Sequence, residues 1–173
     1  MEIDTLAGLP AHPLFVHVPV ILVPMAALAA GLLALFPRLI RRWGWWVVGL
    51  AGVGAVGAIL AAGSGEGLED RVEETAALER HTDLGEVARN VSIVLFVVVL
   101  ALVLAQRFIT VSRIRTVMAS ILMIVTATGA TGTIAAAGHS GAESVWSERI
   151  DSGEQEYEND SEVRTEDPDD QKD

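Results

Sequence analysis

Four long runs of apolar residues constrain the fold of this chain more than any other feature of its sequence. They cover about residues 14–36, 44–62, 87–106 and 117–137, and charged residues are nearly absent from them. Each run has about the 17 to 25 residues that an α-helix needs to cross a bilayer. A helix on the surface of a water-soluble protein would show a polar stripe, and these runs show none. We therefore predict an all-α integral membrane protein whose four helices form an up-and-down bundle.

The acidic residues are concentrated after the fourth run. The chain is therefore expected to divide into a four-span transmembrane domain, residues 1–141, and an acidic tail, residues 142–173. The tail has 13 acidic and 3 basic residues, which make up most of the formal net charge of −11. It has too few large apolar residues to form a core, so we predict that it is disordered; a docking or cation-attracting arm is the alternative. This acidic balance disfavours nucleic acid as a partner, because phosphate binding needs basic patches.

Arginines predict how the helices are oriented. Both short loops between runs are basic and contain no acidic residue, whereas the longer loop after residue 62 is acidic on balance. Short basic loops stay in the cytoplasm. We therefore predict a multi-pass protein of the cell membrane with both termini outside the cytoplasm. The N-terminal sequence MEIDTLAG is acidic and does not predict a cleavable signal. The arginines of the short loops are Arg38, Arg41, Arg42, Arg107, Arg113 and Arg115.

Small residues are frequent in the second and fourth runs. Two rows recur every four positions: Gly54, Ala58 and Ala62, and Thr128, Gly132 and Ala136. Such rows let helices approach closely in lipid, or they clear space for a flat ligand. They could also support a homo-oligomer. The two halves of the chain have runs of similar length but different residues, so the sequence indicates no internal repeat.

All four histidines are predicted to lie at the extracytoplasmic end of the bundle. His12 and His17 lie at the start of the first run, His81 precedes the third, and His139 follows the fourth. An ionisable residue at the membrane boundary is a candidate functional residue. Each histidine is therefore either a ligand or a hydrogen-bonding partner of a helix end. For His12 we favour a cap of the first helix, because Pro13 suits the first helical turn.

The acidic loop carries carboxylates that could contribute to a metal site. Glu69 and Glu73 are four residues apart and would share one helical face, and Asp70 and Glu74 form a second such pair. Such pairs are common on solvated faces. Imidazole nevertheless binds zinc, copper and iron well, so the carboxylates together with the four histidines are candidate metal ligands.

Haem is the other candidate cofactor. The chain has no cysteine, so iron–sulfur ligation and covalent haem attachment are excluded. A haem would be of the b type, with His17 and either His139 or His81 as axial ligands from different helices. His12 is a further candidate ligand. The sequence shows no nucleophile–base arrangement, phosphate-binding glycine loop or HExxH zinc motif, so no catalytic residues are predicted.

These donors favour a binding or redox module. It would hold b haem or a transition metal ion and pass electrons to or from a quinone or a redox protein. The alternative is a structural or accessory membrane subunit without a cofactor, whose histidines bond to helix ends. A metal transporter is disfavoured, because no ionisable residue lies near the middle of any run, where transporters bind their substrates.

Three motifs give the chain a resemblance to a known family. GLPAHPLFVHVP at residues 8–19 resembles the opening GLPxHPLxVHFP of the DUF2231 family of small prokaryotic membrane proteins. SGEGLEDRVEE, followed by LERHTDLGE, resembles TGxxAExxVE…HExxGE, and GHSGAESVW resembles GHxGGxLVY. This chain departs from the family at Val18, Thr82, Ser144 and Trp146. The matching positions are His12, Pro13, His17, Pro19, Glu69, Glu73, His81, Gly138, His139 and Gly141.

The resemblance covers residues 6 to about 146. It implies four spans and a histidine cluster outside the cytoplasm. Members of this family are sometimes joined to cytochrome c or Rieske domains, and that association favours a redox role.

Overall fold

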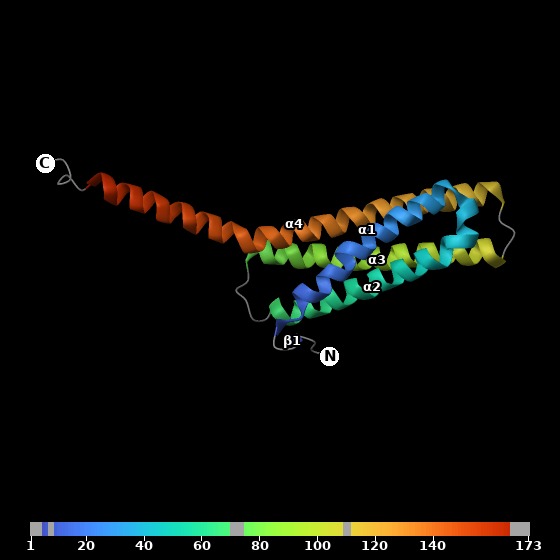
Figure 1. The fold of residues 1–173 in the computed structure, drawn as a ribbon, viewed down its shortest axis with the longest axis horizontal. Coiled ribbons are helices and arrows are strands. Elements are labelled where there is room, and N and C mark those ends of the chain that lie inside the picture. The colour runs from blue at the N-terminus through green and yellow to red at the C-terminus, as the bar shows by residue number, and fades with distance from the viewer. Residues whose placement is uncertain (1–4, 7–8, 70–74, 109–111, 167–173) are drawn as a thin grey trace.

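The computed structural model describes residues 5–6, 9–69, 75–108 and 112–166, with side chains at 11–67, 75–108 and 112–146. Four α-helices account for nearly all of this part of the chain (Figure 1). They are α1 (His12–Leu35), α2 (Ile40–Glu69), α3 (Ala76–Phe108) and α4 (Arg113–Glu166). All four contain a segment long and apolar enough to cross a membrane. The prediction of an all-α membrane bundle is therefore confirmed.

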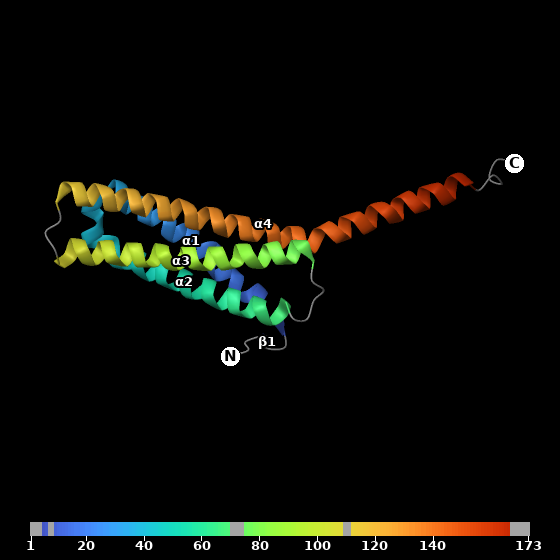
Figure 2. The ribbon, with the colours of Figure 1, turned by 180° about the vertical axis from the view of Figure 1, so that it is seen from behind.

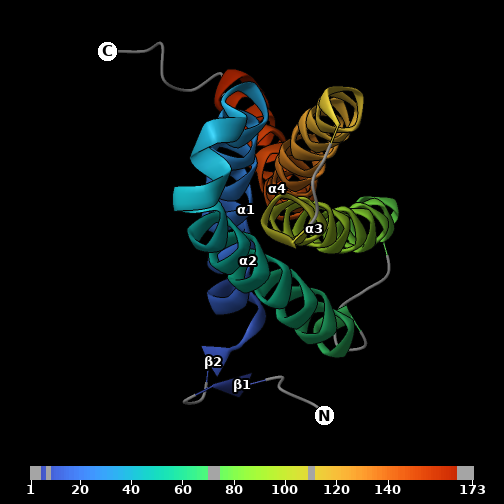
Figure 3. The same cartoon turned by 90° about the vertical axis from the view of Figure 1, so that its right-hand side faces the viewer.

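The helices run alternately up and down and close into a ring. α1 packs against α2 and α4, and α3 packs against the same two helices, so α1 and α3 lie on a diagonal and barely touch (Figure 3). A short 3₁₀ helix, η1 (Pro37–Leu39), joins α1 to α2. A two-residue antiparallel strand pair, β1 (Thr5–Leu6) and β2 (Leu9–Pro10), precedes α1.

Alternation of direction gives the bundle two chemically different ends. We call one the histidine end, because α1 and α3 begin there with His12 and His81. We call the other the arginine end, because α1 joins α2 there and α3 leads into α4. Arg38 lies in the first of these connections and Arg41 and Arg42 in the first turn of α2. Arg107 lies in the last turn of α3, and Arg113 and Arg115 lie in the first turn of α4. The two ends lie at opposite extremes of the bundle, as the two side views show (Figures 1 and 2).

Small residues make the contact between α1 and α2. A Cβ atom at Gly57 would overlap Val18 Cγ1, and one at Gly54 would lie 3.1 Å from Val23 Cγ2. The backbones therefore approach to a distance that larger residues would prevent, as in other membrane helix pairs. The second row of small residues behaves differently, since Thr128, Gly132 and Ala136 on α4 are exposed.

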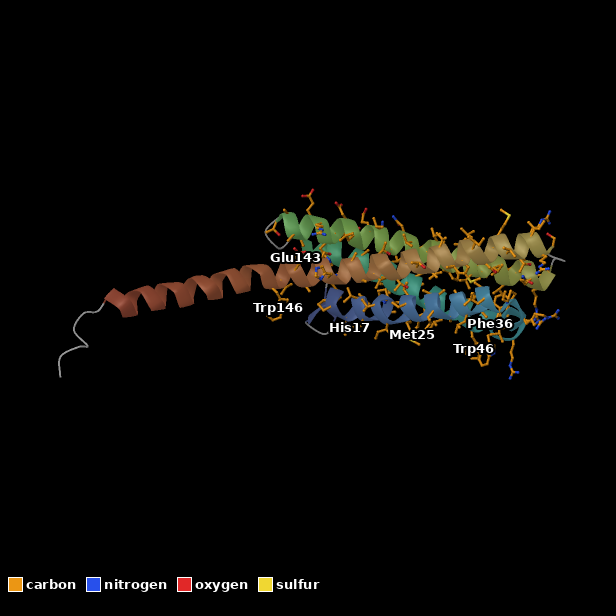
Figure 4. The ribbon with its side chains drawn as sticks, turned by 90° about the horizontal axis from the view of Figure 1, so that it is seen from above. His17, Met25, Phe36, Trp46, Glu143 and Trp146 are labelled. Carbon is orange, nitrogen blue, oxygen red and sulfur yellow. The ribbon has the colours of Figure 1, made fainter. Side chains whose placement is uncertain are left out.

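Large apolar side chains cover the outside of the bundle. Met25, Phe36 and Trp46 are 51%, 58% and 75% exposed, and they project away from the helices (Figure 4). Contiguous apolar surface of this kind marks an interaction with lipid or protein. In a bundle with four candidate spans, lipid supplies the matching environment.

Residues 142–166 continue α4 as a helix that extends beyond the bundle at the histidine end (Figure 1). The prediction of a disordered tail over residues 142–173 stays a prediction, since residues 167–173 lie outside the described part and side chains are described only to residue 146. A helical backbone in this segment has a local cause, because extending a helix that already exists avoids the cost of nucleating a new one. The segment is also rich in glutamate, which has a good helix propensity.

Candidate functional site

His12 is held by α2. It is the first residue of α1, and its Nδ1 lies 2.8 Å from the carbonyl oxygen of Ala61 and 3.5 Å from Ser64 Oγ. A carbonyl oxygen only accepts hydrogen bonds, so we assign the imidazole proton to Nδ1, which donates it to Ala61. The sequence suggested that His12 caps its own helix. In the structure His12 bonds instead to the neighbouring helix α2. In the neutral ring, Nε2 keeps its lone pair.

His81 is held by α4 in the same way. It lies in the second turn of α3, and its Nδ1 lies 3.1 Å from the carbonyl oxygen of Ala137 and 3.2 Å from Ser140 Oγ. The same argument places the proton on Nδ1 and the lone pair on Nε2. An Nδ1–H bond to a backbone carbonyl is the arrangement that commonly orients a metal-binding histidine.

The two serines are matched as well. Ser64 and Ser140 are only 4% and 3% exposed. Each donates its hydroxyl to the carbonyl three residues earlier, which is the same carbonyl that the histidine uses, and each of these distances is 3.0 Å. A buried hydroxyl needs such a partner, because desolvating it without one is costly. Each serine therefore fixes the position of the carbonyl and can also accept from the imidazole.

The residue after each serine is a glycine against which the imidazole lies. A Cβ at Gly65 would lie 3.2 Å from His12 Cε1 and Nδ1, and one at Gly141 would lie 2.8 Å from His81 Cε1. We call His12 with Ala61, Ser64 and Gly65 the first histidine cluster. The second histidine cluster is His81 with Ala137, Ser140 and Gly141.

The two histidine clusters correct the expectation that the chain has no internal repeat. The helix pairs α1–α2 and α3–α4 each bring a histidine near the start of one helix to Ala-x-x-Ser-Gly near the same end of the next. The apolar residues of the two halves differ because lipid-facing positions tolerate many residues. The signal available in the sequence was the recurrence of Ala-x-x-Ser-Gly, which is too short to stand out without the paired histidines.

The two clusters meet at the histidine end. The rings of His12 and His81 have centroids 6.2 Å apart and planes at 89°, although their helices lie on a diagonal. Two imidazoles that shared one metal ion through Nε2, with bonds of about 2.0–2.1 Å, would have centroids roughly 5 to 6 Å apart. The observed centroid distance of 6.2 Å, in an edge-to-face arrangement, lies just above that range. Among the residues that the structure describes, no group of three or more His, Asp or Glu is placed to hold a metal.

His17 and His139 lie outside this ring pair. Both are exposed, and His17 Nδ1 bonds to the carbonyl oxygen of Pro13 in its own helix. Figure 4 shows His17 on the outer side of α1. The structure thus brings His12 and His81 together instead of His17 with His139 or His81. A ligand role for His17 and His139 stays a prediction.

The structure describes the predicted carboxylate ligands only in part. Glu69 is the last residue of α2, its side chain is outside the described part, and Glu73, Asp70 and Glu74 lie entirely outside it. Two other carboxylates at this end form ion pairs between helices. Arg80 Nη1 lies 3.6 Å from Glu143 Oε2, and Arg89 Nη1 lies 3.9 Å from Glu66 Oε1. All of these pairs are partly solvated, so they contribute little to stability.

Comparison with known proteins places this arrangement in a family. No curated protein and no solved structure matches the chain. The model of a family described as "Predicted membrane protein (DUF2231)" matches residues 8–154, which include all four apolar helices and both histidine clusters. The chain therefore belongs to the DUF2231 family of predicted membrane proteins.

Proposed function

We propose that this membrane protein holds one transition-metal centre between His12 and His81, either as a single ion or as the iron of a b haem. The observation that carries the proposal is the distance of 6.2 Å between the ring centroids of His12 and His81. The Nδ1 atoms of both histidines are hydrogen-bonded to backbone carbonyls. That bonding leaves two Nε2 lone pairs at one end of the bundle. Zinc, copper and iron are the metals that imidazole suits best.

Electron transfer is the use that we propose for such a centre when its metal is copper or iron, because zinc has no redox chemistry. The arginines of the short loops favour a cytoplasmic arginine end, which would put the histidine pair near the extracytoplasmic surface. A redox-active metal there would be within reach of a quinone in the lipid or a redox protein in solution. The chain would supply the two imidazoles, their orientation through Ala61 and Ala137, and a partly dehydrated site.

A structural subunit without a cofactor is the second candidate. It is favoured by the fact that each imidazole already joins two helices through its Nδ1 bond. Side-chain hydrogen bonds between membrane helices stabilise a bundle by about 0.6 to 1.7 kcal/mol each. In this case both histidines act by holding α1 to α2 and α3 to α4.

Metal content separates the two candidates. The protein would be produced with haem precursor and transition metals supplied, purified in mild detergent, and analysed by elemental mass spectrometry and by absorption before and after dithionite. We expect one metal per chain in the unaltered protein. A Soret band that shifts on reduction identifies haem, and metal without that band identifies an ion. His12→Ala and His81→Ala should each lower the metal content by at least about tenfold.

His17→Ala and His139→Ala are the matched controls and should keep the metal, because their rings lie outside the pair. A loss confined to His17→Ala would contradict the assignment to His12 and His81. Unaltered protein that contains no metal, combined with a lower melting temperature in His12→Ala and His81→Ala, would favour the structural subunit.

A further inference from the structure

The arginine end holds a shallow surface depression, here called the cleft, that has no part in the histidine site. It lies between the first turns of α2 and the last turns of α3. Its lining consists of Ile40, Arg41, Trp45, Val103, Gln106 and Arg107. Three residues thus come from each helix, and they combine two guanidinium groups, one indole and one amide with two aliphatic side chains.

Close packing of α2 on α3 forms the floor of this cleft. A Cβ at Gly44 would lie 2.8 Å from Val103 Cγ2, so the two helices meet where a larger residue would separate them. Ile40 and Val103 are each 3% exposed. The floor is therefore apolar and dehydrated, and the polar groups stand around it.

The rim of the cleft is cationic and accessible. Arg41 and Arg107 are both exposed, and the ion pairs of the described side chains involve Arg80 and Arg89, neither of which is at the arginine end. Trp45 is 49% exposed, and tryptophan is enriched at the depth of lipid headgroups. A guanidinium group binds phosphate through two parallel hydrogen bonds, which gives geometric specificity beyond charge.

We propose that this cleft binds the headgroup phosphate of an anionic phospholipid. Arg41 and Arg107 would bind the phosphate from two helices, and Trp45 and Gln106 would border the headgroup. One turn from Arg107 towards the middle of α3, the exposed Leu104 continues the surface into the apolar region that acyl chains occupy. Basic pockets between membrane helices commonly bind anionic headgroups. A free anion would use the arginines alone, whereas a lipid also uses this apolar surface.

The test measures bound lipid directly. Protein reconstituted with phosphatidylcholine containing a small fraction of phosphatidylglycerol would be released from detergent and weighed with its retained lipids by native mass spectrometry. We expect retention of phosphatidylglycerol over phosphatidylcholine. An arginine that binds the phosphate directly through charge-assisted hydrogen bonds accounts for at least about tenfold in affinity, so Arg41→Gln with Arg107→Gln should lower retention by at least about 100-fold.

Arg113→Gln with Arg115→Gln is the matched control. It removes the same charge from the same end, at two exposed residues outside the cleft, and should lower retention only by the diffuse attraction that is lost, at most about 25-fold. Arg41→Lys with Arg107→Lys keeps the charge without the two-bond geometry and should give an intermediate loss. Equal losses in the cleft and control variants would overturn the proposal in favour of diffuse attraction. So would equal retention of the two lipids by the unaltered protein.

Discussion

At the scale of single residues, two glycines decide where the candidate ligands lie. Gly65 and Gly141 have no side chain, so the imidazoles of His12 and His81 rest against the helix backbone. The adjacent serines then reach the same carbonyls as the histidines. None of these four residues has a chemistry that predicts a ligand site from sequence, because their role is to position another side chain.

Adding one methyl group tests this positioning. We expect Gly141→Ala, whose Cβ would lie 2.8 Å from His81 Cε1, to displace that imidazole and to destabilise the bundle by about 1 to 3 kcal/mol, the usual cost of overpacking. Gly65→Ala, with 3.2 Å to the His12 ring, should cost less, because a small shift of the imidazole relieves the contact. The measurement is reversible unfolding in detergent, with metal content determined on the same samples. Gly63→Ala and Gly138→Ala are matched controls, since a Cβ at either position meets nothing within 4 Å. If the controls lose as much stability as Gly65→Ala and Gly141→Ala, contact with the imidazole is not the cause.

At the scale of helices, the sequence predicted which segments form helices better than it predicted which helices pack together. Long runs without charge are sufficient to predict four spans, because lipid leaves the backbone little alternative to helix. Rows of small residues predict close approach but do not identify the partner. Gly54 packs against α1, whereas Gly132 on α4 meets nothing within 4 Å. The orientation of each helix about its axis depends on packing with all the others, which a single row does not encode.

The contact of α1 with α2 gives a prediction at this scale. Gly57→Ala should destabilise the bundle by about 1 to 3 kcal/mol, because the added Cβ would overlap Val18 and one of the helices would have to move. Gly49→Ala on the same helix is the control, since its Cβ meets nothing within 4 Å. Unfolding in detergent micelles gives both values. Similar stability in the two variants would show that α1 can move away from the added methyl group at Val18 without a loss of unfolding free energy.

At the scale of the whole molecule, sequence reasoning predicted that the histidines share one end but not which of them meet. His12 and His81 come together although α1 and α3 lie on a diagonal of the ring, because both helices begin at the same end. His17 is only five residues from His12, yet it lies on a different side of α1 and is exposed. The predicted haem ligands were paired because they lie at similar depth in the membrane. Which imidazoles meet depends instead on the direction in which each side chain leaves its helix.

Orientation of the molecule in the membrane is open to a direct test, because the chain has no cysteine. Ser112→Cys and Ala142→Cys place single thiols at exposed positions of the arginine end and the histidine end. If the basic loops are cytoplasmic, as the positive-inside rule predicts, an impermeant maleimide should label Ala142→Cys in intact cells. It should label Ser112→Cys only after the membrane is permeabilised, and the reverse pattern would show an inverted orientation.

The unbroken course of α4 past the second histidine cluster gives the site a mechanical consequence. Ser140 and Gly141 belong to the same helix as Glu166, and a helix rises about 1.5 Å per residue, so roughly 37 Å of helix lies beyond the cluster. Over that length, a rotation of about 5° at the cluster would move the far end of the helix by about 3 Å. By geometry alone, a small rotation of α4 at the second histidine cluster is therefore a displacement of several ångströms at Glu166.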